Sequence, residues 1–333
     1  MTNAMLANRY NAFNPYRRPF TERSGVKTEN IKDTMEFFNC VIFIQETDPD
    51  LSTHREFADN DWHFYAIGNI GDSKKTDDTR ATDPDDPYEC CVEIMDVGLP
   101  LSDFPKDTMI NAMGYTEDET THERKYIWAK PENLDILYER VGEQYVKTSD
   151  TEIDYNKTYY VDILVNDDFS EDYTYGWRYI SDDEDEDVVN FCKQKWIDFY
   201  RFVTQSSDTE FKEHLSDYFV VDSALYYYLF TTRYCMVDNR AKNTFWHYSK
   251  TADLDSNGEP IRKWDLCWDY DNDTSLGLNN YGKQVYRYGL EDIDRDEAGE
   301  EVFRESDSTF FCRIRDLFPN ELKSMYQTLE SKN

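Results

Sequence analysis

The segment from Val237 to Asp271 constrains the fold of this chain more than any other. It begins VDNRAKN, continues through two runs that favour β-strands, and ends WDLCWDYDN. The polar stretch TADLDSNGEP separates the runs, and its Asn-Gly pair is a strong local signal for a hairpin turn. From Trp264 to Asp269, large apolar and polar residues alternate with the two-residue period of a strand. The sequence therefore predicts a β-hairpin with Asp269 at the exit of its second strand.

Polar side chains suited to phosphoryl transfer lie around this predicted hairpin. Asp238 and Asn243 stand before the hairpin, and Asp269 and Asp271 follow it. Transfer of a γ-phosphoryl group needs hard oxygen ligands for magnesium and a carboxylate that accepts the proton of the attacking hydroxyl. We expect Asp269, Asn243 and Asp271 to hold the metal and Asp238 to act as the base. Taken alone, the step from Asp238 to Asn243 is better explained by a turn cap followed by the start of a strand.

Helices are predicted immediately before this segment. The run VVNFCKQKWIDFYRFV has an apolar stripe at helical spacing, formed by Val189, Cys192, Trp196, Phe199 and Val203. The tetrapeptide Ser207 to Glu210 is a capping-box pattern that predicts the start of a second helix. We expect Asp222 to cap a third helix, ALYYYLFTTRY. Further along, FFCRIRDLFPNELKSMYQTLE predicts two helices divided near Pro319.

These features together resemble the CotH kinase family of atypical protein kinases. The resemblance lies in the run SSDTEFKEHLSDYFVVDSALYYYLF, the step from Asp238 to Asn243, and the hairpin ending KWDLCWDYDNDTSLG, where family members read W-D-x-D followed by S-x-G. It implies Mg-ATP-dependent phosphorylation of Ser or Thr on proteins. Position by position, Asp238 matches the catalytic base, Asp269 the principal metal ligand and Asn243 the second metal position.

A weaker resemblance extends to the N-terminal part of the chain. The run MLANRYNAFNPYRRPF is similar to the end of the family's N-lobe helix, and FFNCVIFIQE and WHFYAIGNIG are similar to its paired strands. In the family, a nucleotide-contacting lysine lies on a strand before that helix. The resemblance thus implies either an N-terminally incomplete sequence or a kinase that has lost a phosphate anchor. Lys74, after a Gly-x-x-Gly turn, is a candidate for contact with the nucleotide, although an exposed turn also explains it.

We expect an α+β, protein-kinase-like two-lobed fold with a truncated N-lobe, a β-rich acidic insertion and a helical C-lobe. Residues 1–71 form the partial N-lobe in this division. Residues 72–185 form the insertion, with predicted strands such as YECCVEIMD between acidic loops. Residues 186–333 form the helical C-lobe, which follows the acidic run SDDEDED.

The acidic composition limits the classes of partner. The formal net charge of -33 argues against nucleic acid, because a phosphate backbone would be repelled. It favours a basic, Ser/Thr-containing protein substrate, whereas a role in solubility or halotolerance explains it equally well. The alternative function is a catalytically inactive, kinase-like scaffold of a phage particle or coat assembly, with coat or virion proteins as partners. Aromatic residues beside acids also suit a carbohydrate site, but no motif selects a catalytic pair.

The cysteines and the hydropathy bear on location. The seven cysteines form no C-x-x-C pair and are odd in number, which favours a reducing environment over a disulfide framework. No apolar run reaches membrane-spanning length, and the first residues lack the features of a signal peptide. We expect a soluble protein that is cytoplasmic or associated with a virion or spore coat.

Overall fold

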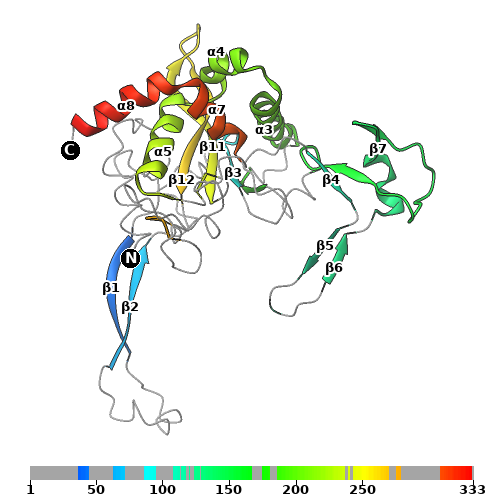
Figure 1. The fold of residues 1–333 in the computed structure, drawn as a ribbon, viewed down its shortest axis with the longest axis horizontal. Helices are drawn as coiled ribbons and strands as arrows, with labels where there is room; N and C mark the ends of the chain where they lie inside the picture. Colours follow the sequence, from blue (N-terminus) through cyan, green and yellow to red (C-terminus); the bar gives the residue numbers. More distant parts are fainter. Residues whose placement is uncertain are drawn as a thin grey trace, which may run out of the picture.

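The structure is a computed structural model of the 333-residue chain, and it combines helices with antiparallel sheets in an α+β arrangement (Figure 1). It describes residues 37–44, 63–71, 86–94, 108–112, 114–117, 120, 124–127, 129–166, 175–180, 186–236, 239–240, 243–269, 275–278 and 308–331. Lys74, Asp238 and Asp271 lie outside these residues.

The main sheet is built around the predicted hairpin. Its strand order is β10-β3-β11-β12, and every neighbouring pair is antiparallel. The strands are β3 (Cys90–Ile94), β10 (Tyr175–Tyr179), β11 (Thr244–Leu254) and β12 (Pro260–Asp269). The hairpin turn contains Gly258 at a φ of 85°, a conformation that glycine adopts without a Cβ penalty. The predicted hairpin is confirmed, and β12 ends at Asp269 as expected.

The helices are α3 (Glu186–Gln205), α4 (Asp208–Tyr218), α5 (Val221–Arg233), α7 (Thr309–Leu317) and α8 (Pro319–Ser331). The predicted start of α4 is confirmed, because the Ser207 side chain caps it by accepting a hydrogen bond from the backbone N–H of Glu210. The apolar stripe of α3 is also confirmed, except that Val188 is buried and Val189 only half-buried. The prediction that Asp222 caps α5 is wrong. The cap position is Val220, without a side-chain hydrogen bond, and Asp222 lies in the first turn.

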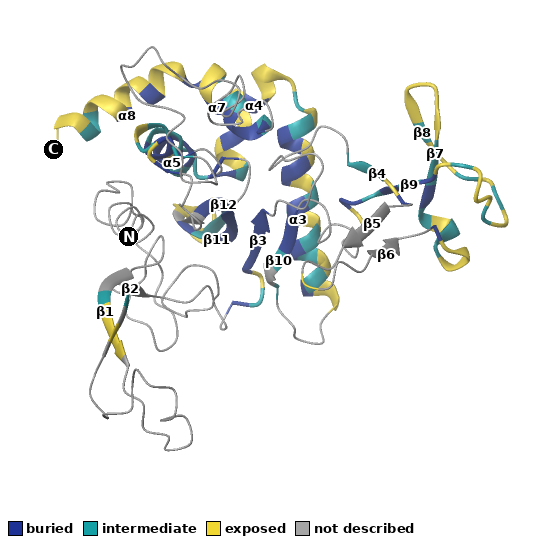
Figure 2. Ribbon diagram, turned by 60° about the horizontal axis from the view of Figure 1, so that its bottom comes forward, coloured by how far each residue is buried: buried dark blue, intermediate teal, exposed yellow. Residues whose placement is uncertain are grey.

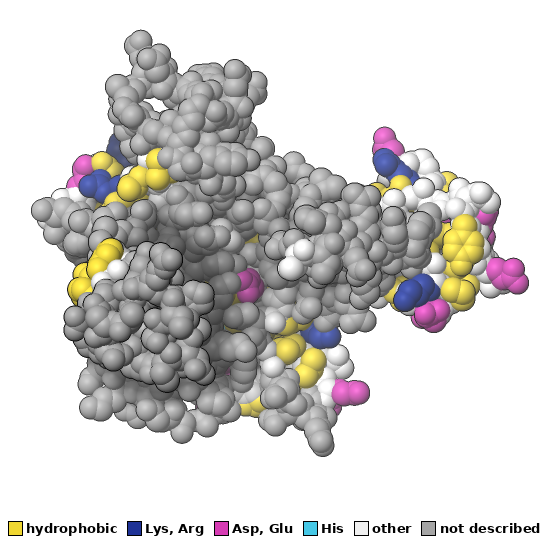
Figure 3. Space-filling view, turned by 90° about the horizontal axis from the view of Figure 1, so that it is seen from below, with side chains coloured by type: hydrophobic (Ala, Val, Ile, Leu, Met, Phe, Trp, Pro, Cys, Tyr) yellow, Lys and Arg dark blue, Asp and Glu magenta, His cyan; other side chains and the backbone are white. Residues whose placement is uncertain are grey.

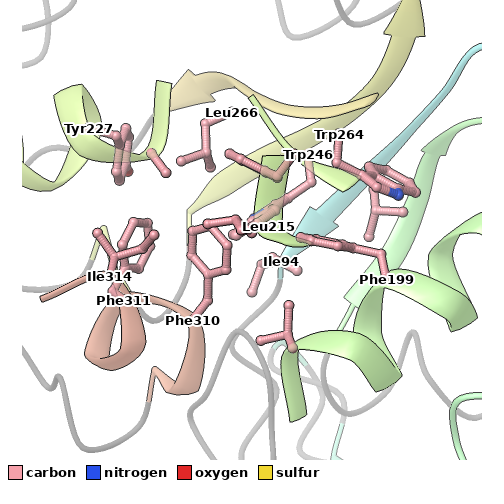
Figure 4. Close-up of a cluster of buried hydrophobic side chains, with 14 of the residues drawn as sticks. Ile94, Phe199, Leu215, Tyr227, Trp246, Trp264, Leu266, Phe310, Phe311 and Ile314 are labelled. Atoms are coloured by element: carbon pink, nitrogen blue, oxygen red, sulfur yellow. The ribbon is translucent and has the colours of Figure 1, made fainter. Parts of the chain in front are cut away.

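An aromatic core joins the helices to one face of the main sheet (Figures 2 and 4). Trp264 of β12 contacts both Trp196 and Phe199 of α3, with ring centroids 5.2 and 5.8 Å away. Trp246 of β11 meets Phe310 of α7 edge to face at 4.9 Å. Large buried rings make many close contacts in a densely packed interior, so the hairpin is held firmly against α3 and α7.

A second, smaller unit has its own sheet and core. Its strand order is β4-β9-β7-β8, with β4 (Met109–Asn111), β7 (Leu137–Val141), β8 (Gln144–Lys147) and β9 (Tyr160–Asp162). A 3-10 helix, η2 (Pro131–Ile136), precedes β7, and β5 (Gly114–Glu117) pairs with β6 (Arg124–Ile127). The core consists of Ala112, Ala129, Leu137, Tyr159 and Val161. Figure 3 shows hydrophobic and charged side chains together on the surface of this unit, at the right.

The remaining described strands form a separate ribbon. β1 (Phe37–Ile44) pairs antiparallel with β2 (His63–Gly71), as the sequence predicts. In Figure 1 this ribbon extends away from the helices and the main sheet. Strands β3 and β10 come from the segment that the sequence assigns to an insertion. That segment therefore contributes both to the main sheet and to the smaller unit.

Within the residues that the structure describes, no helix is both long and apolar enough to cross a membrane. The six cysteines whose side chains are described all carry free thiols.

Candidate functional site

The open end of the hairpin brings three chain segments together. Thr244, the first residue of β11, pairs with Asp269 of β12 on one side and with Ile94 of β3 on the other. The backbone N–H of Asn243 donates a hydrogen bond to the carbonyl of Ile94, with an N–O distance of 3.2 Å. Asn243 and the strand end that carries Asp269 are therefore neighbours at one end of the sheet, opposite the turn at residues 255–259.

An irregularity in the pairing lies just before this end. Phe245 pairs with Trp268 and Trp246 with Leu266, so that Cys267 has no partner in the register. The predicted alternation from Trp264 to Asp269 is therefore interrupted at Cys267. An extra residue in one strand bends it and changes the direction of the residues that follow, and such bulges are common next to active sites.

The chain before Asn243 is anchored to helix α5 through Arg240. Its side chain is 1% exposed. Nε donates to the Thr231 hydroxyl at 2.9 Å, and a terminal nitrogen donates to the Tyr228 carbonyl at 2.9 Å and to the Thr232 hydroxyl. The guanidinium carbon lies 4.0 Å from the centre of the Tyr228 ring. These groups belong to the last turns of α5, where exposed carbonyls and the helix dipole favour a cation.

A second contact fixes the same loop to α5. The hydroxyl of Tyr227 donates to the carbonyl of Asn239, at an O–O distance of 2.6 Å. Tyr227 is itself buried and stacks on Phe311 of α7, with ring centroids 5.6 Å apart (Figure 4). The loop position is thus tied to the aromatic core.

Strained backbone gathers around this loop. Cys235, Asn243 and Leu276 are the non-glycine residues with positive φ in the described part of the chain, at 46°, 62° and 60°. The N–H of Leu276 donates to the carbonyl of Tyr234 at 2.6 Å, and the N–H of Gly277 to that of Cys235 at 3.4 Å. The S-x-G motif at residues 275–277 therefore packs against the end of α5, where the loop begins. Left-handed non-glycine residues cost of order 1–3 kcal/mol each and cluster at functional sites.

The predicted site residues are described to different extents. Asn243 is buried and lies beside the strand end that carries Asp269. For Asp269 the structure describes the backbone but not the side chain. Asp238, Asp271 and Lys74 lie outside the described residues, so their predicted roles stay predictions. Among the side chains that are described, no group of three or more His, Cys, Asp or Glu could hold a metal ion.

Arg240 is the site residue that sequence reasoning missed. The available signal was the polar pair Thr231-Thr232 in the last turn of an otherwise apolar helix. Hydroxyls at buried positions need hydrogen-bonding partners, and the nearby loop contains two cationic residues, Arg240 and Lys242, that could supply one. Periodicity alone does not identify which of them turns inward.

The opposite end of the sheet is held by a buried carboxylate. Asp86, just before β3, accepts hydrogen bonds from Arg262 of β12 at 2.9 and 2.7 Å. It also forms an ion pair with Lys250 of β11 at 2.7 Å. Burial alone would raise the pKa of Asp86, but the hydrogen bonds from Lys250 and Arg262 outweigh it and hold that pKa below its ordinary value. This cluster fixes the three strands whose other ends form the candidate site.

Ionisable side chains also line the sheet face turned away from the aromatic core. Glu89 and Glu93 of the β3 segment, His247 of β11 and Asp265 of β12 are all buried. The Nε2 atom of His247 lies 3.3 Å from a carboxylate oxygen of Glu89. Burying this many ionisable groups costs free energy unless they are paired with one another. The buried polar face is therefore a specific feature of this fold.

Comparison with known proteins gives no relative. No protein-family model, no curated protein and no solved structure matches this chain.

Proposed function

We propose that the chain is an atypical Ser/Thr protein kinase of the CotH type, which transfers the γ-phosphate of Mg-ATP to a protein hydroxyl. The observation that supports this most is the pairing of Thr244 with Asp269, which makes Asn243 a neighbour of the strand end that carries Asp269. The hairpin thus brings the backbone of two residues with candidate oxygen ligands to one end of the sheet.

The local backbone supports the same proposal. A loop tied to α5, a register irregularity before Asp269 and left-handed backbone at Asn243 and Leu276 lie around one place. Such a combination is expected where side chains must be held in a fixed arrangement. The left-handed Cys235 is the ordinary cap of α5, because the N–H groups of Cys235 and Met236 bond the Thr232 and Thr231 carbonyls.

In the proposed site each polar residue has a stated role. Asp238 accepts the proton of the attacking hydroxyl. Asp269 and Asn243, with Asp271, hold Mg²⁺, and their carboxylate and amide oxygens are the hard donors that this ion prefers. Lys74 contacts the nucleotide. Bound Mg²⁺ would neutralise the charge of the triphosphate oxygens.

The fold and the substrate are parts of the proposal. The main sheet with its helices would form the C-lobe of a two-lobed kinase-like fold, and the β1–β2 ribbon would belong to the N-lobe. A net charge of -33 would attract a basic protein substrate at low ionic strength.

Phosphate incorporation from γ-labelled ATP into a basic protein tests this function. We expect Asp238→Asn and Asp269→Asn to lower the rate by about 100-fold or more, because each removes a charge that acts on the reacting groups. Asp253→Asn is the matched control, since this exposed carboxylate lies in the same hairpin near the turn and bonds Lys263 at 2.7 Å. Its rate should equal that of the wild type.

Two results would contradict the proposal. Transfer that survives Asp269→Asn would remove the metal assignment. Absence of transfer by the wild-type chain, on basic and acidic substrates alike, would favour the inactive scaffold instead. Equal rates on basic and acidic substrates at low salt would leave the kinase but remove the basic-substrate preference.

A further inference from the structure

The β1–β2 ribbon carries no Asp, Glu, Lys or Arg. Its strands, FFNCVIFI and HFYAIGNIG, have 8 and 9 residues. The whole chain contains 36 Lys and Arg and 69 Asp and Glu among 333 residues, so charge-free strands of this length stand out from the composition. Interface centres are depleted in charged residues because burying a charge is costly.

One face of the ribbon exposes three large apolar side chains. Val41, Phe43 and Phe64 are 56%, 51% and 61% exposed, and Ile42 is 37% exposed. Phe43 and Phe64 are cross-strand partners whose rings meet edge to face, 6.2 Å apart. Successive strand residues point to opposite faces, so Val41 and Phe43 share one face, which is open, whereas Cys40, Ile42 and its partner Ala66 on the other face are only partly exposed (Figure 2).

The edges of the ribbon are also open within the described part of the chain. β1 and β2 form a two-stranded sheet of their own. A two-stranded sheet is marginally stable in water by itself. An uncharged edge strand is a template for pairing with another chain, which proteins usually prevent with charged residues or proline. Neither strand contains them.

We propose that this ribbon is a dimerisation surface that pairs with the ribbon of a second copy of the chain. Two copies with a net charge of -33 each repel one another wherever acidic surfaces meet. The ribbon carries no acidic residue. It also extends away from the helices and the main sheet, so the acidic parts of two copies can stay apart when their ribbons pair (Figure 1). A two-fold interface uses the same patch on both copies, and an uncharged apolar ribbon is complementary to itself. A basic partner would instead bind the acidic surface. The inference does not depend on catalytic activity.

Sedimentation velocity of the full chain tests the proposal at several salt concentrations. Over a roughly 100-fold range of protein concentration, the wild type should shift from monomer to dimer by mass action. Dimerisation should become tighter as salt rises, because salt screens the repulsion between acidic bodies while the apolar contact persists. A monomer throughout this range, or a dimer that weakens as salt rises, would overturn the proposal.

Substitution on the ribbon locates the contact. Val41→Glu should weaken the dimer by about 100-fold or more, because like charges would be buried against each other. Val141→Glu is the matched control, since this valine is 63% exposed in a hairpin strand of the smaller unit. It should leave dimerisation unchanged. Equal effects of the two substitutions would contradict the assignment to the ribbon.

A thiol in the ribbon gives a second measurement that needs no destabilising substitution. Cys40, in the middle of β1, and Cys312 are half-buried free cysteines, whereas Cys90, Cys91, Cys192 and Cys235 are buried. A short bismaleimide should therefore link two copies through Cys40 in the variant Cys312→Ser, and this link should be lost in the double variant Cys40→Ser/Cys312→Ser. Absence of the covalent dimer in Cys312→Ser, or an equal yield in the double variant, would overturn the proposal.

Discussion

Asn243 has two separable properties, a left-handed backbone and an amide side chain. Its φ of 62° places it among the conformations that asparagine and glycine tolerate better than other residues. Its amide oxygen is a candidate metal ligand beside the strand end of Asp269. Stability reports the first property, and activity reports the second.

Two substitutions at Asn243 separate these properties. We expect Asn243→Gly to keep the stability of the wild type, because glycine adopts a positive φ without strain. Asn243→Ala should lose about 1 kcal/mol, because its Cβ is disfavoured there. Urea unfolding measures both values. Phosphate transfer should fall in both variants, and a fully active Asn243→Gly would show that the amide is not a ligand.

Asp86 gives the clearest pH dependence at the scale of one residue. Its folded-state pKa is held below the ordinary value of 3.8 by Lys250 and Arg262, despite burial. A carboxyl with a depressed folded-state pKa stabilises the fold above the unfolded value, and this contribution is lost as the pH falls through the folded value. The Asp86 contribution should therefore be complete at neutral pH and decline below 3.8.

The measurement is the difference in unfolding free energy between the wild type and Asp86→Asn. This difference should be large at about pH 7 and smaller at about pH 3, because acid protonates the wild-type carboxyl. Subtraction of the variant removes the contribution of the many other carboxylates. A difference that stays constant over this range would show that Asp86 acts through packing instead.

At the scale of elements, local signals predicted the helices and the hairpin. Period and capping residues identified α3 and α4, and the Asn-Gly pair identified the turn between β11 and β12. The Asp222 cap failed because the chain enters α5 from a backbone pairing, in which the Val220 N–H bonds the Trp264 carbonyl. The pairing of β3 with β11 joins residues about 150 positions apart, and strand periodicity carries no information on such partners.

At the scale of elements, the connection between α5 and the loop before Asn243 can be tested directly. We expect Arg240→Gln to lower the unfolding free energy by about 2–4 kcal/mol, since it removes charged hydrogen bonds to Thr231 and Tyr228 in a buried setting. Arg315→Gln is the control, because this half-exposed arginine pairs with its neighbour Asp316. It should change stability by less than about 0.5 kcal/mol. Equal losses in urea unfolding would contradict the anchoring role.

At the scale of the whole molecule, the chain combines an acidic surface with two uncharged regions, one in the core and one on the β1–β2 ribbon. The aromatic core holds the hairpin, and the ribbon offers an uncharged edge. Composition predicted the acidity, and the charge-free runs at residues 37–44 and 63–71 are visible in the sequence, but their exposure depends on how the two strands pack in the fold. For the candidate site, the sequence predicted the hairpin that brings Asn243 beside the strand end at Asp269. Its anchor, Arg240, depends on tertiary contacts.

The most direct test is a crystal structure with Mn²⁺ and a non-hydrolysable ATP analogue, with the metal located by anomalous scattering. The account predicts one ion bound by both the Asn243 amide oxygen and an Asp269 carboxylate oxygen, at roughly 2.0–2.6 Å. An ion held elsewhere, or Asp269 and Asn243 directed away from a common ion, would contradict it.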